Sequence, residues 1–166
     1  VIELNPNYSD AHYNLGLTFK KLGEYQKAKD CHEKAIEIDP NYSDAHYNLG
    51  IIFKELGKNQ KAKSCYEKAI EINPNNANAH NNLGVIFQEL GEHQKAKDCY
   101  EKVITINPNH VDAHNNLGNV YGTIGNQKKS VYHYHKALVN RSDINFEIYK
   151  KKDQGLQPAT SQFYLE

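Results

Sequence analysis

The sequence predicts an all-α solenoid, in which short helical hairpins stack along one axis. The first observation is a tripeptide that recurs every 34 residues, at Asn14-Leu15-Gly16, Asn48-Leu49-Gly50, Asn82-Leu83-Gly84 and Asn116-Leu117-Gly118. The second is an Asn-Pro or Asp-Pro pair that keeps the same spacing and ends at Pro6, Pro40, Pro74 and Pro108. A fixed period of this length is typical of stacked supersecondary units and not of one closed globule.

Each unit carries two helical patterns separated by a glycine. In the first complete unit, apolar residues at helical spacing predict a first helix with one apolar face, formed by Ala11, Leu15, Phe19 and Leu22. Gly23 ends this helix, because glycine tolerates the left-handed conformation found at helix C-termini. A second helix is predicted from Tyr25 to Ile38, and Pro40 cannot continue it.

Small residues inside the helices predict a close contact. Glycine occurs within every predicted first helix, at Gly16, Gly50, Gly84 and Gly118, although it costs about 1 kcal/mol there relative to alanine. The second helices have a small residue at a matching place, at Ala28, Ala62 and Ala96. We therefore expect the two helices of a unit to meet backbone to backbone at these positions.

These residues resemble the tetratricopeptide repeat family. The resemblance rests on the order Leu-Gly, an aromatic residue (Phe19, Phe53, Phe87, Tyr121), Gly, Ala, a second aromatic residue, Ala and Pro, and it extends from Val1 to about Ile144. It implies a right-handed superhelix of helix-turn-helix repeats, whose first helices line a concave side that commonly binds peptides. The sequence departs from the family pattern by placing His12, His46, His80 and His114 where tryptophan is common. It also has His32 where the later units have Tyr66, Tyr100 and Tyr134.

The period divides the chain into repeats. Residues 1–8 match the end of a preceding repeat, and four repeats follow at 9–42, 43–76, 77–110 and 111–144, the last one degenerate. Residues 145–153 could form a capping helix, and 154–166 are predicted to be a tail or linker. The chain begins inside a repeat, so we expect it to be part of a longer protein.

The exposed side of the first helices predicts a peptide-binding face. Its rows are Asp10, Asp44 and Asp112; Tyr13, Tyr47, Asn81 and Asn115; Asn14, Asn48, Asn82 and Asn116; Leu17, Ile51 and Val85; and Lys20 and Lys54. An asparagine amide can donate to a backbone carbonyl and accept from a backbone N–H, so a column of asparagines could hold an extended main chain. This column is similar to the asparagine ladder of O-linked N-acetylglucosamine transferases. The aspartate row favours a ligand with some basic residues.

Composition argues against several other classes of function. The 20 basic and 20 acidic residues are interspersed, which argues against nucleic acid, and no apolar run is long enough to span a membrane. The three cysteines are also spaced by 34 residues, and equivalent points on packed neighbouring helices lie roughly 8–10 Å apart, beyond the limit of about 7 Å between the Cα atoms of a disulfide. This favours a reducing, cytoplasmic compartment. The repeated histidines His12, His46, His80 and His114, which we call the ladder histidines, are too widely spaced to bind one metal ion. His133 and His135 are assigned to the surface. We find no catalytic motif and predict neither a cofactor nor a metal site.

The sequence therefore predicts a non-catalytic scaffold that binds a peptide or protein segment on a concave face. One alternative is a substrate-docking region of a larger enzyme such as a glycosyltransferase. Another is a self-association module that forms a homo-oligomer through an end repeat or the C-terminal tail. No nucleic acid or membrane partner is expected.

Overall fold

The computed structural model describes residues 8–141, which contain eight α-helices and no strand. Compact packing divides the chain into a first unit, Val1–Lys102, and a second unit, Val103–Glu166, and the boundary falls inside α6. The helices are α1 (Ser9–Lys21), α2 (Tyr25–Ile38), α3 (Ser43–Glu55), α4 (Asn59–Ile72), α5 (Ala77–Glu89), α6 (His93–Ile106), α7 (Val111–Thr123) and α8 (Gln127–Val139). The predicted capping helix at 145–153, the tail at 154–166 and most of the segment 1–8 lie outside the described residues.

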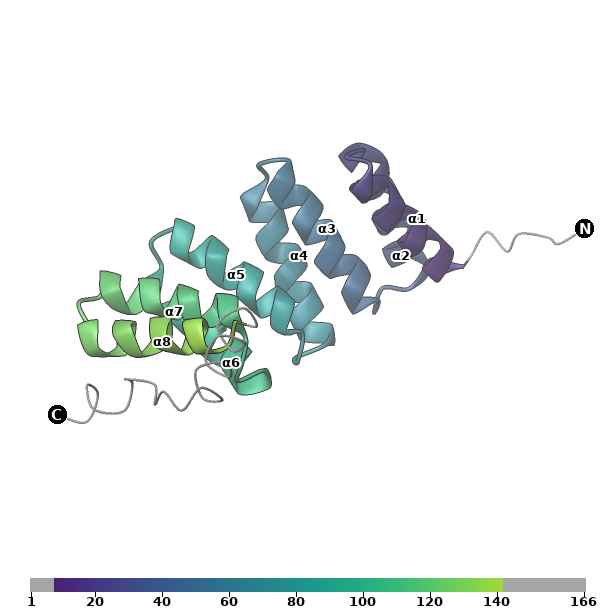
Figure 1. Ribbon diagram of the computed structural model, residues 1–166. Coiled ribbons are helices and arrows are strands. Elements are labelled where there is room, and N and C mark those ends of the chain that lie inside the picture. The colour runs from purple at the N-terminus through teal and green to yellow at the C-terminus, as the bar shows by residue number, and fades with distance from the viewer. Residues whose placement is uncertain (1–7, 142–166) are drawn as a thin grey trace, which may run out of the picture. The chain divides into compact units, whose positions relative to one another are not determined.

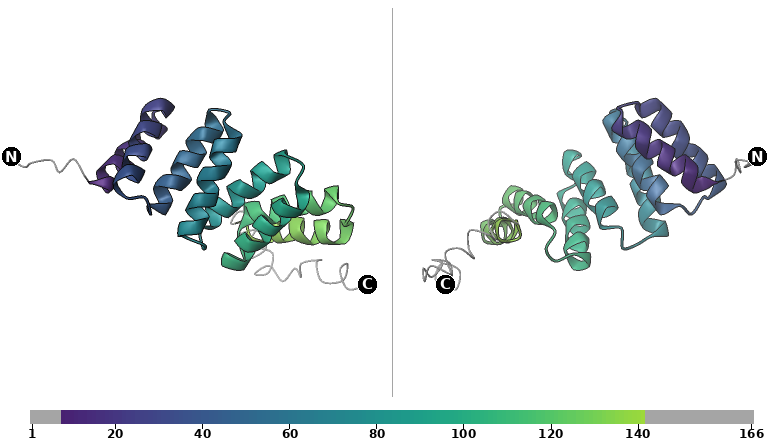
Figure 2. Two further views of the ribbon diagram at one scale, coloured as in Figure 1. Left: turned by 180° about the vertical axis from the view of Figure 1, so that it is seen from behind. Right: turned by 45° about the vertical axis from the view of Figure 1, so that its right-hand side comes forward.

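The helices pair as predicted, which confirms the all-α solenoid class. In the first unit α1 packs against α2 and α3 against α4, and α2 and α4 also contact the first helix of the following pair. In the second unit α7 and α8 lie side by side (Figures 1 and 2). The first helices α1, α3 and α7 therefore each have their own second helix on one flank, and α3 and α5 have a second helix from the preceding pair.

Glycine ends the first helix in the way the sequence predicts. Gly23 has a φ of 75°, in the left-handed region. Its N–H donates to the carbonyl of Lys20 at 3.0 Å, and the N–H of Glu24 donates to the carbonyl of Phe19 at 2.9 Å. These two bonds satisfy carbonyls that would otherwise lack partners at the helix end.

The close contact at the helical glycines is present, but the prediction of its partner was wrong. A Cβ added to Gly84 would lie 2.6 Å from Cε1 of Tyr100, and one added to Gly50 would lie 2.6 Å from Cε1 of Tyr66. The same holds for Gly16 with the ring of His32 and for Gly118 with the ring of Tyr134. The glycine therefore accommodates an aromatic ring of the second helix, and not the backbone beside Ala28.

Three of the ladder histidines, His46, His80 and His114, fasten α3, α5 and α7 to the loop before each helix. Nε2 of His46 lies 3.0 Å from the carbonyl oxygen of Pro40, and His80 and His114 repeat the contact with Pro74 and Pro108 at 3.1 and 2.9 Å. A carbonyl only accepts, so Nε2 carries the proton in each case. Burial lowers the pKa of His80, which favours this neutral form.

The surface assignment of His133 was wrong. His133 is 7% exposed, and its Nδ1 lies 3.0 Å from Nδ1 of the buried His114. Because His114 uses Nε2 toward Pro108, its neutral form accepts at Nδ1, and His133 then donates the proton. The ring of His133 is also stacked on Tyr121, with ring centres 5.4 Å apart. His133 therefore helps to join α7 to α8.

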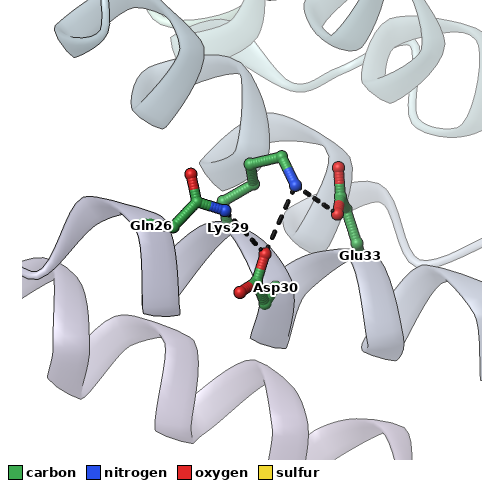
Figure 3. Close-up of polar contacts among 4 residues, drawn as sticks. All are labelled: Gln26, Lys29, Asp30 and Glu33. Carbon is green, nitrogen blue, oxygen red and sulfur yellow. Dashed lines mark hydrogen bonds and ion pairs between the residues drawn. The ribbon is translucent and has the colours of Figure 1, made fainter.

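The solvent side of α2 is an ion-pair surface (Figure 3). Nζ of Lys29 lies 2.6 Å from Glu33 and 3.3 Å from Asp30, and Nε2 of Gln26 donates to Asp30 at 2.8 Å. Such exposed pairs each contribute only a few tenths of a kcal/mol. Their effect is to keep this side of the helix polar and internally neutralised.

Candidate peptide-binding face

We call the exposed side of α1, α3 and α5 in the first unit the first-helix face. The structure brings its α1 and α3 rows into direct contact around Asn48. Nζ of Lys20 donates to Oδ1 of Asn48 at 2.7 Å, and Nδ2 of Asn48 donates to the carbonyl of Asp44 at 2.9 Å and to the hydroxyl of Tyr13 at 3.2 Å. Asn48 is only 5% exposed. Both of its amide donors are thus engaged within the protein.

Burial affects the two groups that flank Asn48. It is the largest cause of the raised pKa of Tyr13, with a smaller contribution from the charge of Asp44. It also lowers the pKa of Lys20, with a smaller contribution from Lys21. Tyr13 therefore remains a neutral hydroxyl at physiological pH and can both donate and accept.

Tyr42 completes this part of the face, and the sequence analysis did not select it. Its hydroxyl donates to Oδ1 of Asp10 at 2.7 Å, and its ring centre lies 5.0 Å from that of Tyr13. Tyr42 lies in the turn just before α3, outside the helical pattern used for the prediction. The repeat pattern could have identified Tyr42, because Tyr8 occupies the same repeat position before α1 that Tyr42 occupies before α3. The contact means that one carboxylate of the predicted aspartate row already has a partner.

The α3 and α5 rows meet around Asn82. Nδ2 of Asn82 donates to the hydroxyl of Tyr66 at 3.5 Å, and Asn82 partly offsets the effect of burial on the pKa of Tyr47. The rings of Tyr47 and Tyr66 are 6.0 Å apart, and burial raises the pKa of both hydroxyls. Asn82 is half-buried, so part of it faces solvent, in contrast to Asn48.

The remaining predicted residues of the first unit line the same face. Lys54 forms an ion pair with Glu89 at 3.3 Å, which links α3 to α5. Asn14 and Asp44 are exposed, and the others are half-buried: Leu17, Ile51, Val85 and Asn81. The face thus combines exposed amide and carboxylate groups with partly accessible apolar side chains.

The residues predicted from the fourth repeat belong to the second unit. Asp112 is exposed on α7, and Asn115 and Asn116 are half-buried there. On the same helix, Asn119 accepts a hydrogen bond from the hydroxyl of Tyr134 at 2.6 Å. These residues form a polar surface of α7 in its own right.

The metal-ligating side chains of the described residues are dispersed, and their cysteines are free. No set of three or more His, Cys, Asp or Glu side chains between residues 8 and 141 is arranged to hold a metal ion. None of the described helices is long and apolar enough to cross a membrane. Cys31, Cys65 and Cys99 are free, and burial raises the pKa of Cys65 and Cys99 to about 11.

We expect Cys65 and Cys99 to alkylate slowly in the folded protein. A thiol with a pKa of about 11 has on the order of 10²-fold less thiolate at pH 8 than an ordinary cysteine, and the thiolate is the reacting form. Iodoacetamide labelling followed by peptide mass spectrometry, with and without urea, measures the difference at each site. Equal rates in the folded and unfolded protein would contradict the expectation.

Comparison with known proteins shows the family. Tetratricopeptide repeat families match residues 9–42 and 77–110, and again 33–64 and 99–132, and a further TPR repeat family matches residues 52–91. Together these matches run without a gap from residue 9 to residue 132, so the chain belongs to the tetratricopeptide repeat family. The comparison with curated proteins found no match.

Solved structures of tetratricopeptide proteins share the fold. MamA is 28% identical with a TM-score of 0.75, and the match covers 92% of this chain and 85% of MamA. YrrB, described as a TPR protein with an unusual peptide-binding site, is 27% identical with a TM-score of 0.71, over 91% of this chain and 78% of YrrB. The first TPR domain of Spaghetti (RPAP3), solved with the HSP90 peptide SRMEEVD, is 25% identical with a TM-score of 0.68, over 75% of this chain and 98% of that one.

Proposed function

We propose that this chain is a non-catalytic scaffold that holds an extended peptide segment along the first-helix face. The observation that carries the proposal is the lateral hydrogen bonding of the first helices. Tyr13 on α1 is bonded to Asn48 on α3, and Lys54 on α3 pairs with Glu89 on α5. These contacts align polar groups of three successive first helices. Two proteins of the same fold, YrrB and the Spaghetti domain, are described with peptides, which supports the proposal.

The three asparagines of the column that lie on the first-helix face have different roles in this proposal. Asn14 and Asn82 are accessible and are the better candidates to bond the main chain of a ligand. Asn48 acts mainly by positioning Lys20 and Tyr13, since its amide donors are already engaged. The asparagine ladder of O-linked N-acetylglucosamine transferases therefore remains an analogy for the accessible positions, and Asn48 follows a different arrangement.

The electrostatics favour a ligand with some basic residues. Asp44 is exposed on α3. Asp10 is exposed on α1, and its Oδ1 accepts one hydrogen bond from the Tyr42 hydroxyl. A lysine or arginine of the ligand could pair with either carboxylate, at a modest strength because both are exposed. The same face would serve as a docking region if the chain were part of a larger enzyme, and that reading stays a prediction. Association between copies and a cytoplasmic location also stay predictions.

Substituting Asn82→Ala should weaken peptide binding at least tenfold, which corresponds to about 1.4 kcal/mol. The variant removes the accessible amide between α3 and α5 while leaving the apolar row in place. The measurement is a fluorescence titration with a peptide selected on the intact chain from a displayed random library.

The matched control is Asn41→Ala, because Asn41 is an exposed asparagine in a turn outside the first-helix face. This variant should bind as tightly as the unmodified chain. Asn48→Ala should weaken binding and also lower stability, because Lys20 and Tyr13 lose a partner. Undiminished affinity of a folded Asn82→Ala variant would rule out the proposed main-chain contact.

A further inference from the structure

The solvent side of α8 differs in chemistry from that of every other second helix. In α2 this side carries Gln26, Lys29, Asp30 and Glu33 (Figure 3), and α6 repeats it with Gln94, Lys97, Asp98 and Glu101. At the same register α8 has Lys128, Val131, Tyr132 and His135, which we call the α8 stripe. The ion-pair surface of α2 is thus replaced by an aromatic and an aliphatic side chain flanked by basic residues.

The replacement removes every acidic group from the helix. Between Gln127 and Val139 there are three lysines and no aspartate or glutamate. The other second helices each contain at least two carboxylates that pair with lysines of the same helix, as Glu33 does with Lys29 at 2.6 Å. The lysines of α8 have no carboxylate on their own helix to pair with.

The apolar groups of α8 face solvent and are held in place. Tyr132 is 52% exposed, Val131 45% and Leu138 49%. At the registers of Val131 and Tyr132, α2 and α6 have a lysine and an aspartate, and only the register of Leu138 is apolar in all of them. The ring of Tyr132 meets the ring of buried His133 edge-on, with centres 5.1 Å apart, and Nζ of Lys136 lies 5.8 Å from the centre of the Tyr132 ring. An exposed aromatic group fixed from both sides is a good anchor for a binding partner, because little side-chain entropy is lost on contact.

We propose that the α8 stripe, with Lys136 and Leu138, is a docking surface for an acidic amphipathic segment of a partner protein. The partner's apolar side chains would cover Tyr132, Val131 and Leu138, and its carboxylates would pair with Lys128 and Lys136. The charge of the helix selects an acidic partner, since a neutral or basic segment would leave the lysines unpaired or repel them. This surface lies in the second unit and is separate from the first-helix face.

Two other occupants fit the observations less well. An anionic membrane surface usually attracts about four to eight clustered basic residues, and α8 contributes three lysines. Its opposite side cannot enter a bilayer, because Ser130, His133 and Ala137 are buried against the rest of the unit. A second copy of the chain offers second helices whose carboxylates already pair with lysines, as on α2 (Figure 3).

The test transplants the surface of α6 onto α8 in the full chain by Val131→Lys, Tyr132→Asp and His135→Glu. Each new residue occurs naturally at the same register of α6, so the fold should tolerate it. The probe is a fluorescent 18-residue helical peptide of glutamate and leucine, and a second probe has lysine in place of glutamate. We expect the glutamate peptide to bind the unmodified chain, the lysine peptide not to bind, and the triple variant to lose at least tenfold in affinity.

Ser64→Asp is the matched control, because it adds the same single negative charge at the Tyr132 register of α4. It should leave the affinity for the glutamate peptide unchanged. Circular dichroism confirms that each variant is folded. Failure of the glutamate peptide to bind, or equal binding by the triple variant, would overturn the proposal. If the glutamate peptide does not bind, and the unmodified chain but not the triple variant sediments with phosphatidylserine vesicles, the stripe would be assigned to a membrane. If the glutamate peptide does not bind, and the unmodified chain but not the triple variant forms a dimer in analytical ultracentrifugation, the stripe would be assigned to contact with a second copy of the chain.

Discussion

Gly84→Ala is expected to lower the free energy of unfolding by about 2–3 kcal/mol, although alanine is the better helix former. The added Cβ would lie 2.6 Å from Cε1 of Tyr100 and 2.9 Å from its Cδ1. Tyr100 is fully buried, and its hydroxyl donates to Oε1 of Gln88 at 3.1 Å, so the ring cannot move aside cheaply. The propensity gain of about 1 kcal/mol is smaller than the cost of this overlap.

Two other glycines provide a graded comparison. A Cβ at Gly122, also inside a first helix, would meet only Oγ of Ser130 at 3.4 Å, so Gly122→Ala should leave stability unchanged or raise it by up to about 1 kcal/mol. Gly118→Ala should be intermediate, because Tyr134 is 39% exposed and can swing outward. Urea denaturation of the full chain followed by circular dichroism gives the three midpoints. A Gly84→Ala midpoint equal to that of Gly122→Ala would show that the rings do not enforce glycine.

The helix boundaries were predictable because local chemistry determines them. A glycine with positive φ ends α1 at the position that the sequence indicates, and Pro40 follows the end of α2. The close approach at Gly84 was also predictable, because a glycine that lowers helix stability recurs inside every first helix. The residue that contacts Gly84 was not predictable. Periodicity identifies which residues face inward, but it does not say which side chain of the neighbouring helix packs over them. The ring of Tyr100, sixteen residues further along the chain, fills the space beside Gly84. The small Ala96 of the same helix only leaves room for this contact.

The rows of the candidate face were predictable from register, but their hydrogen bonding was not. Asn14, Asn82 and Asn116 look equivalent in sequence to Asn48, yet of these four asparagines only Asn48 is buried. The preceding second helix has His32 where the next has Tyr66, whose hydroxyl reaches Asn82. Without that hydroxyl, Asn48 bonds Tyr13 and Lys20. Asn48 and Asn82 thus differ in their hydrogen-bond partners as well as in their exposure.

Acidification should destabilise the protein through His32. The ring of His32 is fully buried against Gly16, and neither of its nitrogens has a hydrogen-bond partner. Burial, helped by the charge of Lys20, lowers its pKa to about 4, whereas an unfolded histidine titrates near pH 6.5. Between these values the unfolded chain binds more protons than the folded one, so stability falls as the pH drops from about 6.5 toward 4. The full difference is on the order of 3 kcal/mol.

His32→Tyr isolates this contribution, because the later repeats have tyrosine at the same register. The phenol does not titrate below pH 7, so the variant should lose less stability than the unmodified chain between pH 7 and pH 4.5. At pH 7 it should be at least as stable, since it replaces a buried ring that has two unpaired nitrogens. Urea midpoints at half-unit intervals of pH give both curves, and the other titrating groups cancel in their difference. Parallel curves would mean that His32 does not titrate differently in the folded and unfolded states, and the acid sensitivity would then have to come from another group.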